Sequence, residues 1–124
     1  MPITYAATIS LLSSIQPPPP EAGFPTSDKI LHATVFGLMA VFVSMAAQRP
    51  GRTFTWQGAL LAIAITTGYG ILNELHQSMI PGRFASAGDA LADCIGAVLA
   101  VGLYYPIARK RRELSVVMGV GGPR

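Results

Sequence analysis

The stretch KILHATVFGLMAVFVSMAAQ, from Lys29 to Gln48, is almost wholly apolar after His32. An α-helix rises about 1.5 Å per residue, so a stretch of this length covers the roughly 30 Å hydrocarbon core of a bilayer. We therefore predict that this segment is a membrane-spanning helix.

The composition agrees with a membrane protein. The chain has 124 residues, of which 51% are hydrophobic and 12% are charged, whereas about 25% of the residues of a soluble domain are charged. The net charge is +3, but four of the nine basic residues stand together at positions 109–112. The basic residues are therefore not spread over the surface of a soluble domain, and we predict no nucleic-acid partner. The length predicts one small domain.

Two further segments are long and apolar enough to span. Residues 56–80 can cross the bilayer with some tilt, and residues 89–108 carry Tyr104 and Tyr105 at the depth of an aromatic belt. Residues 3–15 are apolar but would form a helix only about 20 Å long. The predicted fold is an all-α membrane protein, a small bundle of three long transmembrane helices plus a short N-terminal membrane helix.

The N-terminal segment has two alternative interpretations. It lacks the basic start and the small-residue cleavage site of a secretory signal, so we favour a short membrane helix or a re-entrant segment over a cleaved signal. The proline run QPPPP, residues 16–20, must end any helix formed by this N-terminal segment, because proline lacks an amide hydrogen and fixes φ.

Basic residues in short loops indicate the orientation, because such loops usually face the cytoplasm. We assign residues 1–110 to a transmembrane domain and residues 111–124 to a cytoplasmic basic tail whose end, GVGGPR, is predicted to be disordered. The connection 49–53 and the tail after residue 108 lie on the same side of three spans. Together they hold seven basic residues, against Lys29 and Arg83 on the other side.

This orientation gathers polar side chains into one layer near the outer interface. At about 100° per residue, Asn73, Glu74 and Gln77 share an arc of their helix. Charged groups inside membrane segments are costly and usually face a partner or a wet cavity. We therefore predict that the following residues form one polar site: Asp28, His32, Asn73, Glu74, Gln77, Arg83, Ser86, Asp89 and Asp93.

Several of these positions also have structural interpretations. Ser86 is a candidate N-cap, and Asp89 suits a helix N-terminus electrostatically. Arg83 is placed to pair with Asp89 and shape the loop. Lys29 is interpreted as an interfacial anchor that snorkels to head groups. His76 lies about 60° outside the arc of Glu74 and is interpreted as a packing or interfacial residue.

Four short motifs carry a resemblance to a known family. SDKILH (27–32), NELHQSMIPGR (73–83), SAGD (86–89) and LADCIG (91–96), in this order and spacing, resemble the VanZ-like family of small membrane proteins. The resemblance covers about residues 11–103 and includes the proline run before Asp28. The chain departs from the family pattern at Asp93, where Asn is usual, and at Phe36, where Tyr is common.

The resemblance implies a multi-pass protein of the bacterial inner membrane. The founding member is linked to tolerance of the glycopeptide teicoplanin, so an antibiotic-resistance role is part of the expectation. From the residues, we expect an outer site that binds or modifies a polar envelope ligand, such as a lipid or a cell-wall precursor head group. Arg83 would pair with an anionic group of that ligand, since guanidinium suits phosphate and carboxylate.

Two other functions stay open at this point. The polar residues could lock the helices of a structural accessory subunit in a larger membrane complex. Alternatively, the chain is an enzyme, with His32 or His76 as base or nucleophile and the acids as proton donors or metal ligands. No short metal-binding spacing such as HExxH is present, so we predict no metal and no cofactor. The expected partners are membrane lipids, further copies of the chain or a larger complex.

Overall fold

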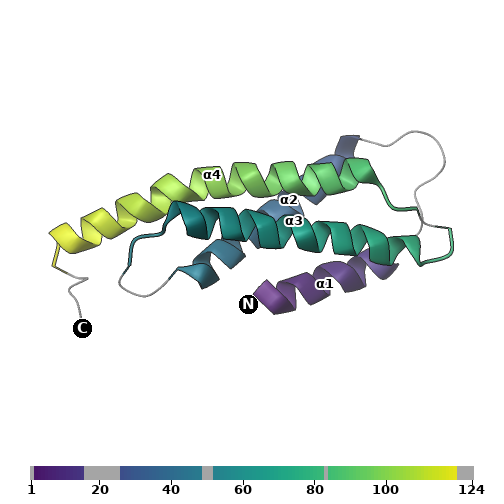
Figure 1. Cartoon of the computed structure of the whole chain (residues 1–124), viewed down its shortest axis with the longest axis horizontal. Coiled ribbons are helices and arrows are strands. Elements are labelled where there is room, and N and C mark those ends of the chain that lie inside the picture. Colours follow the sequence, from purple (N-terminus) through teal and green to yellow (C-terminus); the bar gives the residue numbers. More distant parts are fainter. Residues whose placement is uncertain (1, 16–25, 49–51, 83, 120–124) are drawn as a thin grey trace.

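Four helices make up the computed structural model, which describes residues 2–15, 26–48, 52–82 and 84–119. The described residues contain no strand. Figure 1 shows the helices in chain order, and their bounds are α1 (Pro2–Ile15), α2 (Thr26–Ala47), α3 (Trp56–Ser78) and α4 (Ala87–Val117).

The three long helices form the body of the bundle. Lys29–Ala47, Trp56–Ser78 and Ala87–Val117 are each long and apolar enough to cross a membrane. α2 and α4 run in the same direction and α3 runs opposite to them, while α1 packs against α2 and α3 (Figure 1). The structure therefore confirms the predicted fold of three long helices plus a short N-terminal one.

The core is small and the outside of the bundle is apolar. The buried apolar side chains meet where the helices face one another, and they include Phe36, Ala40, Ala62, Ala97 and Val101. Many large apolar side chains, such as those of Leu72, Leu99 and Leu103, are exposed instead. A helix that is apolar on all sides is typical of a membrane span, because the lipid covers its outer face.

Small residues let α2 and α4 approach closely. A Cβ atom built on Gly96 would lie 2.0 Å from the carbonyl oxygen of Ala33, and one built on Gly37 would lie 3.0 Å from the carbonyl oxygen of Gly96. Glycines at such positions are a common device for packing membrane helices. The contact at Ala33 also sets the height of the preceding residue, His32, against α4.

Two tyrosine hydroxyls tie α1 to the other helices. The hydroxyl of Tyr5 donates to the carbonyl oxygen of Val35 on α2, at 3.2 Å. The hydroxyl of Tyr69 on α3 donates to the carbonyl oxygen of Ala6, at 2.6 Å. These bonds hold the short helix against the bundle, although its own length is insufficient for a full span.

A first prediction tests this attachment. The variant Tyr69→Phe should loosen α1, because it removes a hydrogen bond that contributes about 0.5–1.5 kcal/mol. Hydrogen exchange in detergent should then be faster for the amides of α1. The matched control is Tyr104→Phe, which removes a bond to Gln48 that does not involve α1. Equal exchange of α1 in both variants would contradict the attachment.

The last helix is longer than the sequence indicates. We predicted a span ending at residue 108 followed by a tail, but α4 continues to Val117. The residues after 108 are mainly Arg, Lys, Glu and Leu, which are strong helix formers, and Arg109 stands four residues before the oppositely charged Glu113. The predicted boundary at residue 110 therefore falls inside α4. The helix is followed by Gly119 at φ 69°, and the final segment 120–124 lies outside the described residues.

Candidate functional site

Three helix ends meet at one end of the bundle and carry the predicted polar residues. These are the beginning of α2, the end of α3 and the beginning of α4 (Figure 1). Two of the predicted site residues are not placed there: the side chain of Asp28 and the whole of Arg83 lie outside the described residues.

Ser86 joins the beginning of α4 to the end of α3. Its side-chain oxygen accepts from the backbone N–H of Asp89, at 3.2 Å, which confirms the predicted N-cap. Its own backbone N–H donates to Oε2 of Glu74, at 2.8 Å. The carboxylate of Glu74 therefore lies beside the N-terminus of α4, where the helix dipole favours a negative charge.

Two polar pairs connect α2 to α4. Lys29 Nζ lies 3.2 Å from Asp89 Oδ1, with the two side chains 37% and 13% exposed. His32 Nδ1 lies 3.0 Å from Asp93 Oδ1, and the Asp93 side chain is completely buried. The pairs follow the helical spacing, since their members are three residues apart on α2 and four apart on α4. Lys29 is thus a partner of Asp89 rather than simply an interfacial anchor, as we had interpreted it.

His32, Glu74 and Asp93 form an inner cluster behind the Lys29–Asp89 pair. Each offers one candidate ligand atom, and these atoms lie within 4.8 Å of one another. Oε1 of Glu74 and Oδ2 of Asp93 are buried and have no hydrogen-bond partner among the described residues. A buried acceptor without a partner costs about 1–3 kcal/mol. Two such oxygens in one place make the cluster a candidate site for a ligand or a proton.

The two amide residues of the predicted site are also buried. Asn73 and Gln77 are 2% and 9% exposed, as their shared arc with Glu74 predicts. Both polar atoms of the Asn73 amide are without a hydrogen-bond partner in the described part of the chain. His76 is exposed on another face of α3, which agrees with its interpretation as an interfacial residue.

Gly70 makes room for the inner cluster. A Cβ atom at this position would lie 2.8 Å from Oδ2 of Asp93 and 3.1 Å from its Cβ. The fully buried Asp93 side chain therefore occupies the space beside the bare backbone of α3. Gly70 is not among the residues predicted for the polar site, because its role depends on how α3 crosses α4.

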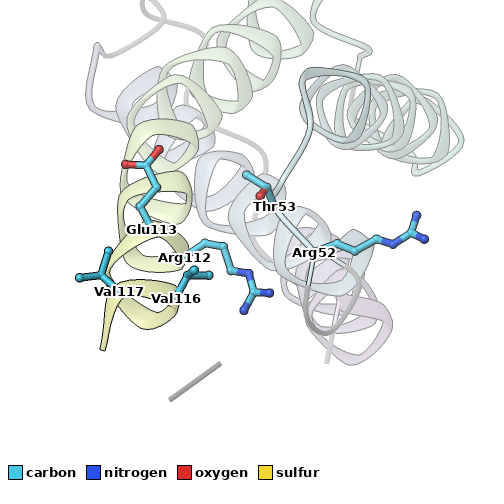
Figure 2. Close-up of a pocket in the computed structure, with 6 residues that line it drawn as sticks. All are labelled: Arg52, Thr53, Arg112, Glu113, Val116 and Val117. Atoms are coloured by element: carbon cyan, nitrogen blue, oxygen red, sulfur yellow. The ribbon is translucent and has the colours of Figure 1, made fainter. Parts of the chain in front are cut away.

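A hollow at the opposite end of the bundle offers a second place to look for a site. It has a volume of about 670 Å³ and is lined by Arg52, Thr53, Arg112, Glu113, Val116 and Val117. Figure 2 shows that Arg52 points away from α4, so the guanidinium groups of Arg52 and Arg112 do not converge on one point. The polar residues at the other end are the better candidate site.

A comparison with known families identifies a match. The family described as VanZ/LLP1 matches residues 3–109. The chain belongs to the VanZ/LLP1 family. The match includes every residue of the candidate site, and together with the three apolar helices it shows a membrane protein of the VanZ kind. A search of the curated proteins and of the solved structures finds no match.

Proposed function

We propose that this VanZ/LLP1 protein binds the polar head group of an envelope lipid, or of a lipid-linked cell-wall precursor, at the outer end of its helix bundle. The observation that supports the proposal is the convergence of ionisable side chains from three apolar helices. Lys29 and His32 come from α2, Glu74 from α3, and Asp89 and Asp93 from α4. Charges inside membrane segments are expensive and usually serve a function.

The arrangement has an accessible rim and a buried interior. Lys29 is the most exposed charged group of the described cluster, and Glu74 and Asp93 lie behind it at 4% and 0% exposure. A head group approaching along the bilayer surface would meet the ammonium group of Lys29 first. Arg83 follows Gly82 in the connection before Ser86, and its guanidinium suits the phosphate or carboxylate of such a ligand.

The proposed location is the inner membrane of a bacterium, with the site on the outer side and the C-terminus in the cytoplasm. Seven of the nine basic residues support this orientation. In intact cells, and in a chain lacking Cys94, a cysteine at position 84 should react with an impermeant thiol reagent. A cysteine at position 51 should react only after the cells are opened. Labelling of position 51 but not of position 84 in intact cells would reverse the orientation.

The binding function is tested by two conservative variants, Glu74→Gln and Arg83→Lys. The first removes the ionisable acid at nearly constant volume, and the second keeps a cation but loses the planar fork. If the residues bind a ligand, both variants should lose the protection of cells against envelope-targeting antibiotics while the melting temperature stays equal or rises. The Gln side chain can still accept from the Ser86 amide while it removes the cost of burying a charge.

The controls use the same substitutions at the opposite end of the bundle. Glu113→Gln and Arg112→Lys alter the charges beside the hollow of Figure 2 and should preserve the protection. Parallel losses of protection and melting temperature in Glu74→Gln and Arg83→Lys would contradict the proposal. They would favour a structural accessory subunit in a larger membrane complex.

A further inference from the structure

The geometry points to a divalent transition-metal site formed by His32, Glu74 and Asp93. One imidazole nitrogen and two carboxylate oxygens, from three different helices, lie within 4.8 Å of one another. Three protein ligands with a vacant fourth position are typical of catalytic and ligand-binding zinc sites. This inference is independent of the proposed head-group ligand, because a resident metal could equally serve a purely structural role.

The charge of the inner cluster matches a divalent cation. With a neutral imidazole, the two carboxylates of Glu74 and Asp93 contribute a charge of −2, and the nearby ammonium of Lys29 is paired with Asp89. Two carboxylates in one buried place repel each other unless a cation or a proton lies between them. One divalent ion would neutralise both, and this neutralisation matters most inside an apolar bundle.

The unpartnered oxygens are the second observation that supports a metal. Oε1 of Glu74 and Oδ2 of Asp93 belong to residues that are more than nine-tenths buried, and neither has a donor among the described residues. The other oxygen of Glu74 accepts from the Ser86 amide, and the other oxygen of Asp93 lies 3.0 Å from Nδ1 of His32. An Nδ1–H that donates to Asp93 leaves Nε2 of His32 as the nitrogen that can bind a metal. Each acid therefore retains an oxygen for a metal while its opposite side is held in place, as is usual for metal ligands.

The donor set also indicates the kind of metal. Imidazole suits zinc and its neighbours in the first transition series, whereas magnesium and calcium prefer oxygen ligands throughout. Ligands at about 2.0–2.2 Å from a tetrahedral zinc ion lie roughly 3.3–3.6 Å apart. The observed spread of up to 4.8 Å must therefore shrink by roughly 1–1.5 Å, through side-chain movements, when the ligands close around an ion.

The test is zinc binding by the full chain, purified in detergent and stripped of metal. Titration calorimetry with Zn²⁺ should give one site per chain, with Mg²⁺ at least tenfold weaker. The variants His32→Asn, Glu74→Gln and Asp93→Asn should each lose at least tenfold in zinc affinity. The controls His76→Asn and Glu113→Gln change an exposed imidazole and a distant acid, and they should bind as the unchanged chain does.

A spectroscopic measurement covers variants that fail to fold. Zinc-edge X-ray absorption of the unchanged chain should show only nitrogen and oxygen ligands. A sulfur ligand would assign the zinc to Cys94 and overturn the proposal. The absence of stoichiometric binding, or binding that survives in all three folded cluster variants, would overturn it as well. None of these three results would decide the head-group proposal, which is measured by antibiotic protection.

Discussion

The variant Gly96→Ala is expected to leave little folded protein. The added Cβ atom would lie 2.0 Å from the carbonyl oxygen of Ala33, 2.6 Å from its carbonyl carbon and 2.7 Å from its Cα. All three atoms belong to the backbone of α2, so no side-chain rotation relieves the overlap, and α2 must move away from α4. Overpacking a tight core costs about 1–3 kcal/mol and occasionally more. We expect at least the upper end of that range here.

The measurement is the melting temperature and the yield of monodisperse protein in detergent. Gly68→Ala and Gly102→Ala are the matched controls, since a Cβ at either position meets no described atom within 4 Å. Alanine is favoured over glycine in a helix by up to about 1 kcal/mol, so both controls should melt at the same temperature as the unchanged chain or slightly higher. If Gly96→Ala melts with them, α2 and α4 do not cross as closely as described.

The long apolar helices and the shared polar face at the end of α3 could be predicted from the sequence, because both depend on local pattern. Apolar segments long enough for a bilayer predict the long helices, and helical periodicity predicts that Asn73, Glu74 and Gln77 share a buried arc. Ser86 as the N-cap of α4 is likewise a local feature, confirmed by its contact with the Asp89 amide. The end of α4 at Val117 could not be predicted in this way, because hydropathy marks the end of a span but not the end of a helix.

The pairing of side chains between helices could not be predicted in the same way. Lys29 meets Asp89, and His32 meets Asp93, because α2 crosses α4 at Gly96 at one particular height. A helix moved by one turn would pair other residues without changing the apolar pattern. The inner cluster has the same origin. Its three candidate ligands come from three different helices, so they show no short metal-binding spacing in the sequence. The prediction of no metal rested on that spacing.

Gly70→Ala is expected to damage the inner cluster while the bundle stays folded. The new Cβ atom would lie 2.8 Å from Oδ2, 3.1 Å from Cβ and 3.3 Å from Cγ of Asp93. Unlike the atoms that oppose Gly96, these belong to a side chain, which can rotate away. Asp93 should then lose its 3.0 Å contact with His32. The folding free energy should fall by about 1–3 kcal/mol, and zinc affinity by at least tenfold, about 1.4 kcal/mol.

The contact itself can be followed without reference to zinc or to antibiotic protection. In nitrogen-labelled protein, the ring signals of His32 should shift in Gly70→Ala, whereas those of the exposed His76 should not. Gly68→Ala, two residues earlier on α3 and facing open space, should leave both sets of signals unchanged. Alanine at three helical glycines would then give three outcomes: Gly96→Ala disrupts the fold, Gly70→Ala disrupts the inner cluster, and Gly68→Ala disrupts neither. Unchanged His32 signals in Gly70→Ala would show that Asp93 does not occupy the space beside α3. Asp93 would then no longer count as a member of the inner cluster or as the partner of His32.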